Sequence, residues 1–201
     1  MDGIAETGRG FAAGLAGYGL ETKDVAFEQV ATVADDGRIE GYASLFGSPD
    51  QSGDVVERGA FAKSLDRLRA AGRAVKLLWQ HDPAEPMGVW DMVREDDRGL
   101  KVRGRLLTET RRGREALALL RAGAIDGLSI GYRAIRSVRG DHGGRILTEI
   151  DLWEVSLVTF PMLPEARAAA CRPGDEAEDA QEDLGRVLAD ALSEARGRLR
   201  G

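Results

Sequence analysis

The 201-residue sequence has very little of the two residue types that carry much metal and redox chemistry. It contains one cysteine, Cys171, and two histidines, His81 and His142. A single cysteine cannot form an intramolecular disulfide, which suits a reducing compartment. Structural zinc sites take four cysteine or histidine ligands, and this chain has three such residues. We therefore expect no metal and no cofactor, and any imidazole chemistry has to use His81 or His142.

Long apolar runs and an excess of positive charge are also missing. No apolar run approaches the roughly 20 residues that a membrane-spanning helix needs. The short apolar segment at 11–20 follows acidic residues instead of the basic start of a signal peptide. The net charge is −6, whereas nucleic-acid-binding proteins usually carry a basic face. We expect a cytoplasmic protein with neither membrane nor nucleic-acid partners.

What the sequence does contain is a series of short strand-like runs interrupted by two helical patterns. The strand-like runs are 25–33, 38–46, 74–80, 87–93, 99–107, 127–138 and 146–158. Apolar residues at helical spacing predict helices over 59–72 and 110–123, each ending at a glycine. The polar, proline-containing stretch 81–86 is predicted to be a loop. Short connections and hairpins of this kind predict an α+β fold with a curved sheet or barrel.

The two ends of the chain differ from this pattern. Residues 1–22 are rich in glycine and small residues without a sustained period, so we expect a flexible N-terminal extension. Residues 23–167 are predicted to form the folded domain. Residues 168–201 are predicted to be a linker followed by an acidic, amphipathic helical tail.

One short motif suggests a nucleophile. Residues 127–131, Gly-Leu-Ser-Ile-Gly, match the G-x-S-x-G elbow of α/β-hydrolases. That elbow requires a helix directly after the serine, and an acid and a histidine further along the chain. Here β-favouring residues follow Gly131, and the histidine downstream is His142 in a glycine-rich turn. The match is coincidental, and Ser129 is expected on a strand. Glycines two residues away on its face would let another chain approach closely.

Two further polar residues lie in apolar surroundings. His81 follows an apolar strand, whereas His142 is expected to be an exposed turn residue. Glu154 interrupts an otherwise apolar strand, so it is expected to be buried, and a buried carboxylate requires a partner. That partner is either an arginine, in a structural ion pair, or the His81 imidazole, which a carboxylate would orient. Asp151, which alternation places on the opposite face of the strand, is the alternative acid.

Four stretches, taken in this order, resemble the prohead (capsid maturation) proteases of tailed phages, a family related to the herpesvirus assemblin serine proteases. They are GYASLFGSPDQSGDVVERGAF at 41–61, LLWQHDPAEPMGVW at 77–90, the segment 99–132 that ends in DGLSIGY, and EVSLVTFPMLPEA at 154–166. Because they are co-linear over about 25–167, they are more specific than any single motif.

The resemblance implies a herpesvirus-protease-like, mainly antiparallel β-barrel with surrounding helices. It implies that Ser129 is the nucleophile, that His81 is the base, and that Glu154 is the third residue, at a position held by histidine in the herpesvirus branch. The implied activity is that of a serine endopeptidase that forms an acyl-enzyme while processing capsid or scaffold proteins, and itself, during head maturation.

The resemblance also implies partners and a location. The expected substrate is the major capsid protein or its scaffolding segment, and copies of the chain are expected to associate inside the prohead. The expected location is the bacterial host cytoplasm, within the assembling procapsid of a phage, a prophage remnant or a gene transfer agent.

Three other functions remain open from the sequence. A catalytically inert capsid-assembly scaffold would keep the fold, and Ser129→Ala would change neither assembly nor processing. An unrelated esterase would hydrolyse small acyl esters without using Glu154. A hydrolase that used Cys171 would have its nucleophile beyond the predicted fold, with no histidine nearby in the sequence.

Overall fold

The computed structural model describes residues 21–25, 36–140, 143–160 and 168–169. This part of the chain contains nine strands and two helices. The strands are β1 (Glu21–Val25), β2 (Arg38–Leu45), β3 (Val55–Val56), β4 (Lys76–Trp79), β5 (Asp82–Glu95), β6 (Gly99–Leu106), β7 (Gly127–Arg139), β8 (Arg145–Val158) and β9 (Ala168–Ala169). The helices are α2 (Ala62–Ala70) and α3 (Arg111–Arg121).

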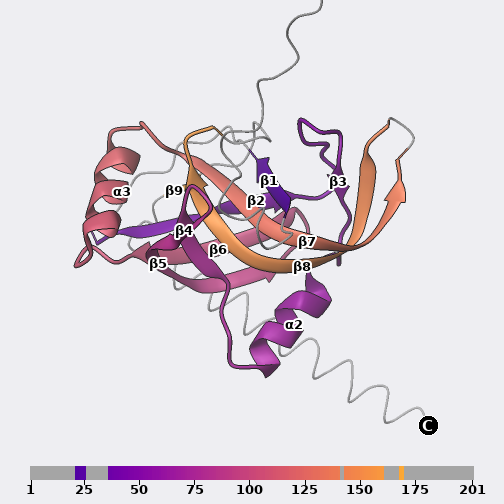
Figure 1. Ribbon diagram of the computed structural model, residues 1–201, viewed down its shortest axis with the longest axis horizontal. Helices are drawn as coiled ribbons and strands as arrows, with labels where there is room; N and C mark the ends of the chain where they lie inside the picture. Colours follow the sequence, from indigo (N-terminus) through magenta and orange to yellow (C-terminus); the bar gives the residue numbers. More distant parts are fainter. Residues whose placement is uncertain (1–20, 26–35, 141–142, 161–167, 170–201) are drawn as a thin grey trace, which may run out of the picture. The chain divides into compact units, whose positions relative to one another are not determined.

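All of these strands belong to one sheet, in the order β1-β7-β8-β4-β5-β6-β2-β9, with β3 added to β8. The strand pairs are antiparallel except for β3–β8 and β4–β8, which are parallel. Figure 1 shows the long strands β7 and β8 curving together. The curl brings β1 into contact with β2, although the two lie near opposite ends of the strand order. The predicted α+β class and mainly antiparallel sheet are confirmed, in the form of a curled half-barrel.

Both predicted helices are present. Helix α2 is followed by Gly72, whose φ of 61° suits a helix end that favours glycine. The N-cap residue of helix α3 is Thr110, whose side-chain oxygen accepts the Gly113 N–H at 3.0 Å. In Figure 1, α2 lies beside β8 and α3 beside β5, in agreement with their contacts. Neither helix is long and apolar enough to cross a membrane.

One face of the sheet, the core face, carries the apolar interior. On β7 and β8 it is formed by Ile130, Tyr132, Leu152 and Val155, none of which is more than 1% exposed. Burying each large apolar side chain contributes about 1.5–3 kcal/mol to the stability of the fold. This packing fixes the register of β7 against β8, because a shift by one residue would turn these side chains away from the core.

Strand β8 contains a β-bulge at Trp153. Glu154 pairs with Gly131, whereas Leu152 pairs with Tyr132, the next residue of β7, so Trp153 is one residue in excess. Successive residues of a strand point to opposite faces. The bulge therefore lets Glu154 point away from the core while the residues on both sides of it stay in register with the core face.

The bulge corrects the predicted position of Asp151. Alternation alone places Asp151 and Glu154 on opposite faces. Asp151 pairs with Arg133, and Glu154 pairs with Gly131 two residues earlier on β7, so both acids lie on the same face of the sheet. We call this the site face and define it on the two strands by Ser129, Gly131, Asp151, Glu154 and Ser156.

The predicted loop over 81–86 was also wrong. Strand β5 already begins at Asp82, which pairs with Trp79, so the connection from β4 has two residues. Two register shifts in this pairing produce irregular points in the ladder. Prolines are tolerated in strands at such irregular points, and the strand includes Pro83 and Pro86.

At the N-terminal side, the strand predicted from 25 begins earlier, since β1 starts at Glu21 and pairs with β7. Residues 26–33 of that predicted strand lie outside the described residues. His142, Cys171 and the tail over 170–201 lie outside them as well. The domain boundaries stay a prediction.

Candidate active site

His81 is the second residue of the two-residue turn between β4 and β5. Gln80 has a φ of 49° and His81 a φ of 62°. Positive φ at both central residues is what a type I′ hairpin turn requires, and glycine or asparagine usually occupies it. Each non-glycine residue held in this region costs about 1–3 kcal/mol, and such strain is concentrated at functional sites. The strained turn presents His81 at the end of β4.

Strand β8 and Thr159, the residue that follows it, hold this turn through three hydrogen bonds. The Gln80 N–H donates to the Leu157 carbonyl oxygen at 3.0 Å. The Gln80 side-chain amide donates to Thr159 Oγ1 at 2.6 Å. The His81 N–H donates to Ser156 Oγ at 3.2 Å. Both residues with positive φ are thus bonded to the strand that also carries Glu154.

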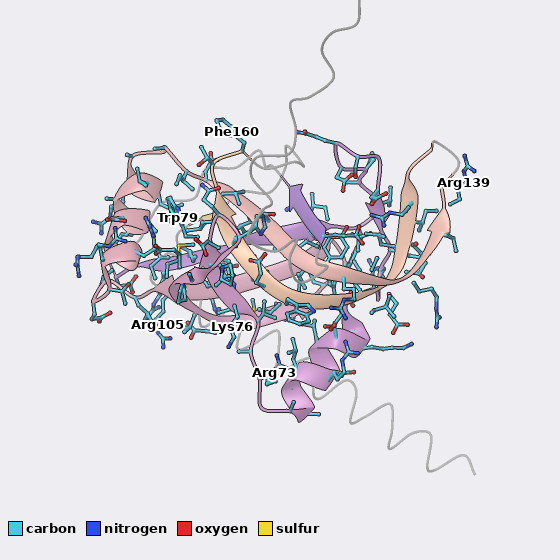
Figure 2. All side chains as sticks on the ribbon, viewed as in Figure 1. Arg73, Lys76, Trp79, Arg105, Arg139 and Phe160 are labelled. Atoms are coloured by element: carbon cyan, nitrogen blue, oxygen red, sulfur yellow. The ribbon has the colours of Figure 1, made fainter. Side chains whose placement is uncertain are left out.

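Helix α3 also contacts this hairpin, through Arg112. The Arg112 guanidinium lies 5.0 Å from the centre of the Trp79 ring, which is a cation–π contact. Trp79 is labelled in Figure 2. Arg112 Nε also donates to Glu85 Oε2 on β5 at 2.9 Å. This hydrogen bond lowers the pKa of Glu85, so its carboxylate stays ionised. The contacts tie α3 to both strands next to His81.

The three predicted site residues come together at hydrogen-bond distance. Ser129 Oγ lies 2.5 Å from His81 Nε2, and His81 Nδ1 lies 2.6 Å from Glu154 Oε1. An ionised carboxylate only accepts hydrogen bonds, so Nδ1 carries the proton in this arrangement. Nε2 of the neutral ring is then the acceptor for the Ser129 hydroxyl. The arrangement can therefore remove a proton from Ser129.

All three residues are buried, with 0% of Ser129, 7% of His81 and 2% of Glu154 exposed. A buried carboxylate is costly unless its oxygens are bonded. Glu154 meets this condition, since Oε1 bonds to His81 and Oε2 accepts from Ser156 at 2.5 Å. The partner of the buried acid is thus an imidazole and not an arginine. Because Ser129 has no exposed surface, a substrate reaches its Oγ only after the atoms that cover it move.

Gly131 makes room for the acid. A Cβ atom at this position would lie 2.1 Å from Glu154 Oε1 and 2.8 Å from its Cδ. Real Cβ atoms do not approach neighbours this closely, so any side chain at 131 would displace the carboxylate. The sequence indicated a close approach at this glycine, and the approaching group is the Glu154 side chain.

Asp151, the alternative acid, bonds elsewhere. Its Oδ1 accepts from Arg67 at 2.6 Å and from the Ser64 hydroxyl at 3.4 Å, both on α2. Its Oδ2 accepts from Trp153 Nε1 at 3.1 Å. The described contacts of Asp151 lead to α2 and not to His81.

Sequence reasoning missed Ser156, which bonds both to Glu154 and to the His81 backbone. Its signal in the sequence is a polar residue two positions after Glu154 in the same apolar strand. The described residues contain no group of three or more histidine, cysteine, aspartate or glutamate side chains that could hold a metal ion.

Most of this chain is similar in sequence to known proteins. The profile of a family described as Caudovirus prohead serine protease matches residues 23–180. The chain is 34% identical over 148 residues to the prohead protease of Enterobacteria phage HK97, covering 71% of this chain and 63% of that protein. It is 31% identical over 151 residues to a capsid polyprotein of Pseudomonas phage PAJU2, covering 71% of this chain and 21% of that protein. The chain thus spans less than two thirds of the length of each relative.

A solved structure with a similar fold is that of the bacteriophage T4 capsid assembly protease, gp21. The TM-score is 0.57 at 17% sequence identity, over 71% of this chain and 98% of that chain. At this identity the likeness concerns the fold alone.

Proposed function

Because the chain belongs to the prohead serine protease family of tailed phages, we propose that it is a serine endopeptidase that cleaves capsid or scaffold proteins during head maturation. The observation that carries this proposal is the continuous series of hydrogen bonds from Ser129 Oγ through the His81 ring to Glu154. An imidazole between a hydroxyl and a carboxylate is the arrangement that activates a serine nucleophile.

In the proposed acylation step, Ser129 Oγ attacks the carbonyl carbon of the scissile peptide bond while its proton passes to His81 Nε2. The new Oγ–C bond gives a tetrahedral oxyanion. When the C–N bond breaks, the protonated His81 gives this proton to the leaving amine. The acyl group is then held on Ser129 as an ester.

In the proposed deacylation step, a water molecule takes the place of the amine. His81 Nε2 accepts a proton from the water as its oxygen attacks the ester carbonyl. The proton returns to Ser129 Oγ when the ester bond breaks, which releases the carboxylic acid and restores the resting enzyme. Hydrolysis therefore needs no cofactor.

Glu154 acts through His81 in both steps. Its carboxylate keeps the ring proton on Nδ1, which leaves Nε2 free to accept, and it stabilises the imidazolium that forms. The burial of this pair strengthens the interaction, because electrostatic attraction is less screened in a low-dielectric interior.

The proposed substrates are the scaffolding segment of a major capsid protein and the chain itself. The relative named a capsid polyprotein supports this choice, since 21% of its length aligns with this chain and its name refers to capsid. We also propose that copies of the chain associate within the prohead, in the bacterial host.

Co-expression with the capsid protein of the same phage or prophage tests the proposal. Wild-type protein should shorten the capsid protein at a defined peptide bond that mass spectrometry identifies, and Ser129→Ala should leave it intact. Ser44→Ala is the matched control, because Ser44 is equally buried and its Oγ has no hydrogen-bond partner among the described residues. Equal processing by the wild type and Ser129→Ala would reject the protease and favour an inert scaffold.

A further inference from the structure

Ser156 joins the two parts of the candidate site that the triad alone does not connect. Its hydroxyl is fully buried, donates to Glu154 Oε2 at 2.5 Å and accepts the His81 backbone N–H at 3.2 Å. Its Cα is the strand partner of Ser129 on β7 and of Leu78 on β4. Ser156 thus lies between Ser129 on β7 and the end of β4, the strand that leads into the turn with His81.

We infer that Ser156 is a positioning residue that fixes both the carboxylate of Glu154 and the backbone of His81, an inference that rests on the proposed function. The hydrogen bonds form a closed circuit. It runs from the His81 N–H to the Ser156 hydroxyl, on to the Glu154 carboxylate, and back to His81 through Nδ1. The Ser156 hydroxyl therefore orients the Glu154 carboxylate and also holds the backbone of His81.

The carboxylate needs this second donor. With Oε1 bonded to the imidazole, Oε2 would be a buried anionic oxygen without a partner if the hydroxyl were absent. A hydrogen bond to the charged form of a carboxylate stabilises that form. The O–H···O distance of 2.5 Å is in the range of such charge-assisted bonds. Ser156 thus gives Oε2 a hydrogen-bond partner and fixes the orientation of the Glu154 carboxylate.

The turn needs the acceptor side of the same hydroxyl. His81 has a φ of 62°, in a region that a histidine occupies only when its surroundings hold it there. Its N–H is buried and donates to Ser156 Oγ. Without this acceptor the N–H would lose its bond, and the position of the ring relative to Ser129 would be less well determined.

Ser64 provides a matched control elsewhere in the molecule. It is also fully buried, its hydroxyl accepts the Leu152 N–H at 2.9 Å, and it lies 3.4 Å from the carboxylate of Asp151. Ser64→Ala and Ser156→Ala therefore remove the same atoms from similar surroundings. Only the second change touches the His81–Glu154 pair.

Imidazole titration by NMR tests the inference without relying on activity. The full chain has two histidines, and His142→Gln leaves the His81 signal alone. In that background, Ser156→Ala should raise the pH midpoint of the His81 signal by about half a unit or more, because the pair loses a donor to its anionic member and binds a proton more readily. Ser64→Ala should leave the midpoint unchanged. Lys76, the β4 strand partner of Glu154, is present in every variant, so its charge does not contribute to the difference between their midpoints.

The rate of labelling by a fluorophosphonate provides a second readout. Ser156→Ala should slow the labelling of Ser129 by about 10- to 100-fold, the loss expected when a reacting group is displaced by a fraction of an ångström. The rates are normalised to the folded fraction measured by circular dichroism. Should Ser156→Ala fail to fold, Ser156→Cys keeps the branching of the side chain with a weaker donor and should move the midpoint in the same direction by less.

The outcomes separate this inference from the proposed function. A midpoint that stays or falls in Ser156→Ala overturns the positioning role, as does a loss of labelling that only follows the folded fraction. If wild-type Ser129 is unlabelled while the midpoint rises as expected, the positioning of the pair stands and the proposed nucleophile does not.

Discussion

Asp151 and Glu154 lie three residues apart on β8 and on the same face of the sheet, yet they have different partners. Each carboxylate has a serine hydroxyl beside it, Ser64 in the first case and Ser156 in the second. The Asp151 side chain is 25% exposed and bonds to Arg67, whose guanidinium keeps its charge in proteins. The Glu154 side chain is 2% exposed and bonds to His81.

The partner and the burial of a carboxylate determine which chemistry it can support. A histidine changes its charge near neutral pH, so a carboxylate bonded to it can stabilise a charge that appears during a reaction. A carboxylate bonded to arginine neutralises a charge that is always present. Asp151 therefore attaches α2 to the sheet, and Glu154 is suited to catalysis.

Removing the charge of each acid in turn should separate the two carboxylates most strongly. Glu154→Gln should lower the rate of Ser129 acylation by about 10³-fold or more, since the imidazolium loses its counter-charge and the ring its fixed tautomer. Asp151→Asn, the matched change, should keep the wild-type rate. Fluorophosphonate labelling kinetics measure both. Equal losses in the two variants would show that the distinction between the acids is wrong.

A second effect comes from filling the space beside Glu154. Gly131→Ala places a Cβ 2.1 Å from Oε1, which forces the carboxylate away from His81. We expect labelling about 10²-fold slower, as for other misplaced catalytic groups. Gly140→Ala is the control, because its Cβ would lie 3.2 Å from the Gly144 carbonyl oxygen in the β7–β8 turn. Wild-type kinetics in Gly131→Ala would contradict the proposed geometry.

On the Asp151 side, Arg67→Ala should change stability and not activity. The Arg67 side chain is 58% exposed, so its ion pair with Asp151 contributes at most about 1 kcal/mol to the free energy of unfolding. Urea unfolding measures the difference, which should shrink at high salt because exposed charges are screened. A slower labelling rate in this variant would mean that the two carboxylates are coupled.

The smallest effect concerns Glu149, a third carboxylate of β8, which accepts from Lys63 on α2 at 2.8 Å. The hydrogen bond from Lys63 lowers the pKa of Glu149. A depressed carboxyl pKa stabilises the fold above the unfolded value of about 4.3, and this contribution is lost as pH falls through the folded pKa. Lys63→Met should therefore be less stable than wild type at neutral pH and equal to it in acid. Unfolding curves at several pH values measure the difference in the free energy of unfolding between the two proteins. A difference that stays the same at every pH would contradict this prediction.

Much of the fold and of the candidate site follows from local sequence patterns. Glu154 is a polar residue in an apolar strand, so its burial could be inferred from the sequence, although its partner stayed open between an arginine and His81. The grouping of Ser129, His81 and Glu154 in one site came from the family resemblance. The two helices follow from apolar spacing and a final glycine. These features depend on near neighbours in the chain.

What could not be predicted depends on pairing between distant residues. The bulge at Trp153 is set by the register of β8 against β7, which changes the face of Asp151 relative to simple alternation. The apolar residues Ile150, Leu152, Val155 and Leu157 change phase at this point, and this is the signal in the sequence.

The turn at Gln80 and His81 could not be predicted either, because it contains no glycine or asparagine. Contacts with β8, which are distant in sequence, hold these two residues at positive φ.

Fluorophosphonate labelling followed by peptide mapping tests the proposed triad, with the protein alone and co-expressed with its capsid protein. We expect a label on Ser129 that disappears in His81→Ala and persists in Asp151→Asn. A label on another serine, a Ser129 label that survives His81→Ala, or no label in either preparation would contradict it.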